Sequence, residues 1–189
     1  MIMSKTPYRI SFFGGGTDYP IWYKNNGGEV LSTTIDKYLY LTCRHLPPFF
    51  NHKHRIVWSQ IEKVNSLDEI KHYAVKKIFK YMKIKKGLEL HYDGDLPAQS
   101  GMGSSSAFVV GLMNLLHAFK GKELSKKVLA NKSLFIEQRI LNETVGSQDQ
   151  ISTSYGGFNS IKFYKNKTFS VNSFSIKKKI FSKLEKNLF

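Results

Sequence analysis

An uncharged loop rich in glycine and serine constrains the fold of this chain more than any other feature. The stretch LPAQSGMGSSSA, residues 96–107, leads into an apolar run that ends at Leu116. Small residues let backbone N–H groups approach an anion, and the N-terminus of a following helix adds partial positive charge. Serine hydroxyls add donors and can bind Mg²⁺. The loop is therefore a candidate phosphate-binding turn, and its alternative is a flexible turn with a helix cap.

The loop differs from two common nucleotide-binding motifs. It lacks the Gly-Lys-Ser/Thr ending of a P-loop. Gly101 and Gly103 fit the dinucleotide fingerprint, but Ser106 stands where the third glycine belongs. The loop alone therefore does not identify a nucleotide-binding class.

Residue patterns elsewhere predict strands first, then helices, then strands. The expected strands have alternating or β-rich sequences and cover residues 5–13, 30–43 (as one or two strands), 56–61 and 88–92, with a hairpin of 158–164 and 167–174. Five helices are expected. The first starts at Ser66, the second runs from the loop to Phe119, and the third covers 125–142. The fourth is short and is closed by Gly156 and Gly157, and the fifth occupies the tail after residue 175. This order predicts an α+β fold with a mixed sheet packed against helices.

Composition is typical of a globular protein, with 41% hydrophobic and 14% aromatic residues. The longest apolar run, residues 107–116, is interrupted by Gly111 and is too short to span a bilayer. The N-terminal residues lack the apolar segment of a signal peptide. A single cysteine, Cys43, excludes an internal disulfide and a cysteine-based zinc site. We expect a cytoplasmic protein.

The net charge of +15 raises the alternative of a nucleic-acid or anionic-membrane partner. However, residues 162–189 hold eight lysines and one acid, and no RNA-reading motif is present. A solvated lysine-rich surface therefore explains most of the charge, and we expect neither partner. The basic tail, with apolar residues at steps of four from Ile176 to Leu188, could alternatively be a membrane-surface helix.

Glu137 is the first candidate site residue outside the loop. On a helical wheel it falls inside an apolar arc made by Leu129, Ala130, Leu134, Ile136, Ile140 and Leu141. A buried carboxylate is costly unless it is paired or bound to metal. Glu137 is therefore a candidate functional residue. The alternative interpretation is that it forms a structural ion pair with a buried Arg or Lys.

Asp149 and Arg9 are weaker candidates. Asp149 follows a glycine turn at the start of a short helix, where a carboxylate could accept a hydroxyl proton or bind metal; ordinary N-terminal acid placement is the alternative. Arg9 and Ser11 lie on the strand face opposite Tyr8 and Ile10, just before GGGTD, and so place a cation near that turn. The alternative is that the face with Arg9 and Ser11 is an exposed face of an edge strand. We expect all six histidines to be surface or hydrogen-bonded core residues.

Three segments in order, PYRISFFGGGTD, PAQSGMGSSSA and VGSQDQ followed by GG, resemble the GHMP kinase superfamily. The second segment is similar to that family's ATP-phosphate motif. Met102 stands in place of the usual Leu, and Ser106 stands where Ala is common. The first is closest to the sugar 1-kinase branch, especially the D-glycero-D-manno-heptose 7-phosphate kinase group. The resemblance covers residue 4 to about 165, and it implies the family's N-terminal domain, which is like domain 2 of ribosomal protein S5.

The resemblance implies ATP and Mg²⁺ as cofactors and a sugar or sugar phosphate as acceptor at its anomeric hydroxyl. Asp149 would be the general base, and Arg9 would stabilise the transferring charge or keep Asp149 ionised. Ser105 and Glu137 would bind Mg²⁺, and the sugar would contact Gly15, Gly16, Thr17 and Asp18. The implied ATP-binding residues are Pro97, Ser100, Gly101, Met102, Gly103, Ser104, Ser105 and Ser106.

Residues 1–174 are expected to form this ATP- and sugar-binding domain, and residues 175–189 a linker helix or the start of a second domain. Family members have a C-terminal domain with another glycine-rich motif, which this chain does not contain. The chain is thus expected to be a fragment or a short form. The rival functions are a non-catalytic nucleotide- or sugar-binding relative and a basic nucleic-acid-binding domain.

Overall fold

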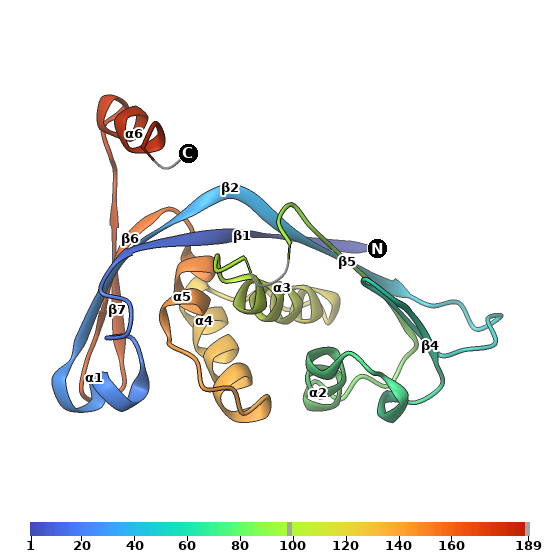
Figure 1. Ribbon diagram of the computed structural model, residues 1–189. Helices are drawn as coiled ribbons and strands as arrows, with labels where there is room; N and C mark the ends of the chain where they lie inside the picture. The colour runs from blue at the N-terminus through green and yellow to red at the C-terminus, as the bar shows by residue number, and fades with distance from the viewer. Residues whose placement is uncertain (98–99, 188–189) are drawn as a thin grey trace.

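One long strand, β2 (Gly28–His45), organises the sheet in the computed structural model, which describes residues 1–97 and 100–187. β1 (Ile2–Phe13) runs antiparallel along one edge of β2. On the other edge, β6 (Phe158–Phe163) pairs with the first part of β2 and β5 (Leu88–Gly94) with the last part. The predicted segment 30–43 is therefore a single strand, and it connects the two ends of the molecule (Figure 1).

β3 (His54–Val57), β4 (Ile61–Val64) and β7 (Phe169–Phe174) complete the seven-stranded sheet of the described residues, in the order β4-β3-β5-β2-β6-β7 with β1 against β2. β3 is parallel to β5 and the other pairs are antiparallel, so the predicted mixed sheet is confirmed. The predicted strand 56–61 is wrong. The N–H of Trp58 donates to the carbonyl of Gln60 at 2.9 Å, and this turn splits the segment into a hairpin.

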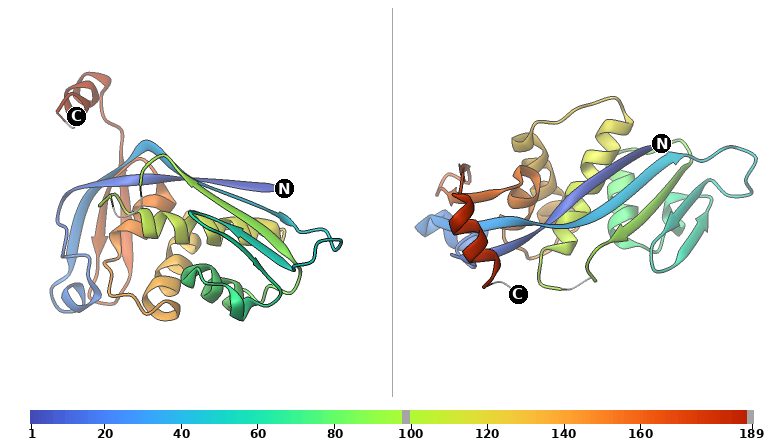
Figure 2. Two further views of the ribbon diagram at one scale, coloured as in Figure 1. Left: turned by 45° about the vertical axis from the view of Figure 1, so that its right-hand side comes forward. Right: turned by 90° about the horizontal axis from the view of Figure 1, so that it is seen from above.

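The helices are α1 (Pro20–Asn26), α2 (Tyr73–Tyr81), α3 (Ser104–Phe119), α4 (Lys126–Phe135), α5 (Gln148–Tyr155) and α6 (Lys178–Glu185). Two short turns accompany them, the 3₁₀ turn η1 (Leu67–Glu69) and the π-helical turn η2 (Ile136–Ile140). α2, α3, α4 and α5 lie on the same face of the sheet, and α6 stands away from them (Figures 1 and 2). This is the α+β arrangement that the sequence predicts.

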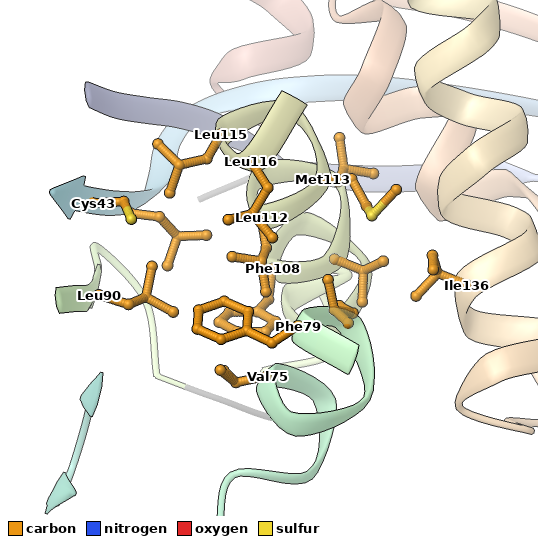
Figure 3. Packing of buried hydrophobic residues seen from close by; sticks show 14 of the residues in the cluster. Cys43, Val75, Phe79, Leu90, Phe108, Leu112, Met113, Leu115, Leu116 and Ile136 are labelled. Atoms are coloured by element: carbon orange, nitrogen blue, oxygen red, sulfur yellow. The ribbon is translucent and has the colours of Figure 1, made fainter. Parts of the chain in front are cut away.

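α3 is the centre of the core. Its buried side chains Phe108, Leu112 and Leu116 lie between the sheet and α2, as Figure 3 shows. Gly111 explains the interruption of the apolar run, because a Cβ there would lie 2.7 Å from the Thr6 hydroxyl oxygen of β1. The glycine lets α3 approach β1 closely, and this contact fixes where the helix begins and hence where the glycine loop lies.

The helix expected from Ser66 starts later. The Ser66 hydroxyl donates to the Glu69 carboxylate at 2.8 Å, but its side chain caps no backbone N–H among the described residues, and only η1 follows it. Ile70 is extended and fully buried, and the Glu62 carboxylate accepts hydrogen bonds from the N–H groups of the next two residues, Lys71 and His72. α2 therefore begins at Tyr73, with His72 as its cap.

The C-terminal predictions are partly met. α4 begins after Ser125 as expected, but its last turn widens into η2 and ends at Ile140. α6 has no buried residue, and Leu188, the last expected apolar position of the tail, lies outside the described residues. The domain boundary at residue 174 stays a prediction. In the described part of the chain, no helix has both the length and the apolar character that crossing a bilayer needs.

Candidate active site

Arg9 and Asp149 form the most definite polar contact of the predicted site. Nε and Nη2 of Arg9 on β1 each donate to one carboxylate oxygen of Asp149 on α5, both at 2.7 Å. Nη1 donates to the carbonyl of Gly101 at 2.8 Å, and the Arg9 backbone N–H donates to the carbonyl of Met102. A bidentate pair fixes both groups in one plane. Arg9 therefore joins strand, glycine loop and helix, and β1 is not an exposed edge face at this point.

The glycine loop needs its glycines for conformation and for space. Gly101 and Gly103 have φ of 76° and 74°, which is the left-handed region. A Cβ on Gly103 would lie 3.3 Å from Oδ2 of Asp149, so a side chain there would press on the ion pair. α3 starts directly after Gly103, and its first-turn N–H groups face the same site. Met102 packs its side chain against the core, which anchors the loop from below.

The GGGTD turn is fastened to the start of α5. The Asp18 side chain is fully buried; its carboxylate accepts hydrogen bonds from the N–H groups of Gly16 and Gln148, both at 3.0 Å. A Cβ on Gly146 would lie 2.0 Å from Oδ2 of Asp18, so this approach requires glycine. The Thr17 hydroxyl donates to the carbonyl of Gly14 at 2.7 Å. Asp18 thus positions the turn, and its predicted contact with a sugar stays a prediction.

Glu137 is fully buried on η2, as the helical wheel predicts. Its Oε2 accepts hydrogen bonds from the Ser106 hydroxyl, at 3.0 Å, and from the Gln150 side-chain amide. Its Oε1 has no partner among the described residues. Burial, outweighing these hydrogen bonds, raises the pKa of Glu137 to about 7. The alternative of a structural pair with a buried cation is not what the described residues show.

A cavity of about 330 Å³ brings most of the predicted residues together. Its lining contains Arg9, Asp18, Gly101, Gly103, Ser104, Ser105, Ser106 and Asp149, along with Tyr19, Val145, Gly146 and Gln148. Glu137 lies behind Ser106, to which it is hydrogen-bonded. Ser106, rather than Ser105, makes this contact within the described residues, and Ser105 is exposed.

The other predicted residues that the structure describes are not among the residues that line this cavity. Gly15 and Gly16 are exposed, and a Cβ on Gly15 would lie 3.8 Å from the side-chain amide nitrogen of Gln148. Pro97 is exposed, and the Ser100 hydroxyl is buried without a partner in the described part of the chain. Ala98 and Gln99, between them in the glycine-rich motif, lie outside the described residues.

Sequence reasoning missed two glutamines. Gln148 accepts a hydrogen bond from the Ser11 hydroxyl at 2.7 Å, which fastens β1 to α5, and Gln150 donates to Glu137. Both flank Asp149 in VGSQDQ. A short polar helix start that holds three hydrogen-bonding side chains in succession is the feature that could have indicated them.

Comparison with known proteins finds kinases that contain a similar domain. Residues 69–157 match the family described as GHMP kinases N terminal domain. The chain is 31% identical to the D-glycero-alpha-D-manno-heptose 7-phosphate kinase of Campylobacter jejuni, over 97% of this chain and 57% of that protein. It is 28% identical to the galactokinase of Pyrococcus furiosus, over 88% of this chain and 47% of that protein.

Among solved structures, the chain superposes on a D-glycero-D-manno-heptose 1-phosphate kinase of Bacteroides thetaiotaomicron with a TM-score of 0.85 and 26% identity. The match covers 98% of this chain and 63% of that one. The chain thus spans about half to two thirds of the length of these relatives.

Proposed function

The chain carries a GHMP kinase N-terminal domain, and from this premise we propose that it supplies the phosphoryl-transfer site of an ATP-dependent sugar kinase. The observation that carries the proposal is the Arg9–Asp149 pair, which lies in one cavity with the glycine loop and the start of α3. A fixed carboxylate beside an anion-binding helix terminus is the arrangement that phosphoryl transfer to a hydroxyl needs.

The ATP phosphates would lie against the loop from Gly101 to Ser106. The N–H groups of the first turn of α3 are directed there, and the left-handed glycines keep the approach free of side chains. Pro97, Ser100 and Met102 would shape the loop, with Met102 holding it to the core. Arg9 uses three of its five N–H donors on Asp149 and Gly101, so two remain for the transferring phosphoryl group.

Asp149 would be the general base. Arg9 engages both of its oxygens, but a carboxylate has about four acceptor positions, so a substrate hydroxyl can still donate to it. The hydroxyl proton passes to Asp149, the hydroxyl oxygen bonds to the γ-phosphorus, and the bond from that phosphorus to the β–γ bridging oxygen breaks, which leaves ADP. Arg9 would hold the carboxylate in place through its two hydrogen bonds.

The residues present fit a divalent cation. Oε1 of Glu137 is a buried oxygen without a partner among the described residues, and Ser105 presents a hydroxyl at the start of α3. Mg²⁺ prefers oxygen ligands, usually one or two protein groups together with substrate phosphates. When bound, it would neutralise charge on the phosphates; Ser105 and Glu137 would hold it, and Ser106 and Gln150 would orient Glu137.

The acceptor would be a sugar or sugar phosphate that lies near GGGTD and reacts at its anomeric hydroxyl. Because the Campylobacter relative is a heptose 7-phosphate kinase, a heptose phosphate is the leading candidate. Gly15, Gly16 and Thr17 would contact the sugar, and Asp18 would hold the turn and reach the sugar when it is bound.

The test is turnover with ATP, Mg²⁺ and a panel of heptose 7-phosphate, fucose and galactose, with sugar 1-phosphate detected by phosphorus NMR. Because the relatives are longer, the assay uses the longest reading frame that contains this chain.

Asp149→Asn should lower kcat by about 10²- to 10⁴-fold without weakening ATP binding. Asp68→Asn, which alters an exposed ion pair, is the matched control. An active Asp149→Asn enzyme refutes the assigned base, and ligand binding without turnover of any sugar supports a non-catalytic relative.

A further inference from the structure

A second cavity of about 620 Å³ borders the candidate active site. It lies between α1 and the connection from η2 to α5, and it shares Tyr19 and Val145 with the first cavity. Figure 1 shows α1 facing the end of α4 and the chain that leads from there to α5. Its size is within the roughly 300–1,000 Å³ typical of small-molecule sites. A substrate that reacts beside Asp149 therefore has room to extend past Tyr19.

Two cations from different elements line this second cavity, Lys24 on α1 and Arg139 on η2. Arg139 differs from the other three arginines of the chain, because Arg9, Arg44 and Arg55 each pair with a carboxylate. Within the described residues, neither Arg139 nor Lys24 takes part in an ion pair. Two cations that converge on a cavity without a paired carboxylate are suited to an anionic ligand.

The remaining lining is mostly uncharged and contains both apolar and polar side chains. Asn25, Asn142 and Thr144 offer amide and hydroxyl groups of the kind that bind sugar hydroxyls. Among the described residues, Glu143 is the one acid on the lining, against the two cations. Neutral polar groups together with two cations match a polyol with one anionic end better than they match a neutral sugar or a wholly anionic ligand.

We propose that this cavity binds the phosphate of a phosphorylated sugar acceptor, with Lys24 and Arg139 as its ligands. The phosphate is at the end of the sugar remote from the hydroxyl that reacts beside Asp149. The inference rests on the proposed function for the reaction, but phosphate binding by this cavity is independent of turnover. η2 then has two functions, because it places Glu137 in the core and Arg139 on the cavity.

The experiment compares binding of mannose 6-phosphate, mannose, inorganic phosphate and ATP by calorimetry. The proteins are wild type, Arg139→Gln, Arg139→Lys and Lys24→Gln. Lys85→Gln is the control for loss of one positive charge at a residue that lines neither cavity. The wild type should bind mannose 6-phosphate more tightly than mannose. Arg139→Gln and Lys24→Gln should each weaken the phosphorylated sugar by about 10- to 100-fold, the range for a lost charged hydrogen bond. Mannose and ATP affinities should not change.

Arg139→Lys should recover part of the affinity, because it keeps the charge but not the bidentate geometry. Lys85→Gln should bind like the wild type. Equal affinity of the wild type for both sugars, or no binding of either, overturns the phosphate subsite. A loss of ATP affinity equal to the loss of sugar-phosphate affinity assigns the cations to the nucleotide and also overturns it.

Turnover distinguishes the subsite from the proposed function. If mannose 6-phosphate binds selectively but no sugar is phosphorylated, the subsite stands and the kinase assignment fails. If mannose and mannose 6-phosphate are phosphorylated with equal kcat/KM, the kinase assignment stands and the subsite fails.

Discussion

Two buried glutamates lie in opposite electrostatic surroundings. Glu89 on β5 is 3% exposed and bonds with Arg44, Arg55 and His91, with contacts between 2.5 and 3.0 Å. Glu137 on η2 is fully buried, and its hydrogen-bond partners among the described residues are the neutral side chains of Ser106 and Gln150. Burial raises the pKa of Glu89, but the hydrogen bonds and charges of its partners outweigh burial and lower it below the usual range. For Glu137 burial prevails.

This difference separates a carboxylate that stabilises the fold from one that is available to a ligand. Glu89 already has its cations, so its charge contributes to folding. Glu137 has one oxygen without a partner in the described part of the chain, and its charged form is unfavourable until a cation arrives. Removing each carboxylate should therefore affect a different property.

The largest expected effect is on catalysis. Glu137→Gln keeps the side-chain shape and an oxygen for Ser106 and Gln150, but it removes the charge that would hold Mg²⁺. We expect kcat/KM to fall by about 100-fold or more, since losing even supporting groups of a metal site costs about 10- to 100-fold. Glu89→Gln should leave the activity of the folded protein close to wild type. Equal losses in both variants would contradict the comparison.

The next largest effect is on the free energy of unfolding, and here Glu89→Gln is the variant that should lose more. Glu89→Gln leaves Arg44 and Arg55 without their carboxylate, and we expect a loss of about 1–3 kcal/mol, less than for a fully buried pair because both arginines are partly exposed. Glu137→Gln should be neutral or stabilising. Urea unfolding measures this through the midpoint at constant m-value. A destabilised Glu137→Gln would show that the carboxylate has a structural partner.

The two glutamates should also give opposite dependences of stability on pH. Glu137 keeps its proton in the folded state up to a pH of about 7, whereas the unfolded chain loses it near 4.5, so its contribution falls as pH rises between these values. The slope is at most about 1.4 kcal/mol per pH unit. Glu89 contributes above its unfolded pKa, and that contribution is lost as pH falls through its lower folded pKa.

The difference in stability between wild type and Glu137→Gln isolates the Glu137 term. His54, His72 and His117 have pKa values lowered by burial, so their contributions rise with pH in the same range. A difference that does not change between pH 5 and 7 would mean that Glu137 is already ionised in the folded protein.

The smallest effect is the response to the metal alone. Millimolar Mg²⁺ should stabilise the wild type by about 1 kcal/mol, as expected for a weak ligand of the folded state, and Glu137→Gln much less. Near pH 6 the wild type should release protons on binding, because the cation favours the carboxylate. Thermal unfolding and calorimetry in two buffers of different ionisation enthalpy measure both. Equal stabilisation of the two proteins would place the metal elsewhere.

Sequence reasoning found features that depend on local pattern. The helical wheel predicts that Glu137 is buried, and the glycine turn predicts that Asp149 starts a helix. It could not find the contact between Asp18 and Gln148, because 130 residues separate them and nothing in their spacing brings them together. It also misplaced the start of α2, because the Glu62 carboxylate captures the N–H groups that the helix would have used. Pattern gives the face of an element, and tertiary contacts give its partners and ends.

The widened turn η2 makes the candidate site sensitive to chain length. A π-helical turn holds one residue more than an α-helical one, and here the N–H of Leu141 reaches back five residues to Ile136 at 2.8 Å. Deleting Gln138, which separates Glu137 from Arg139, would allow an ordinary α-helix and leave these two side chains as neighbours about 100° apart. Glu137 and Arg139 could then no longer face the core and the second cavity at the same time. A single-codon deletion would separate the two functions, whereas most substitutions would leave the turn intact.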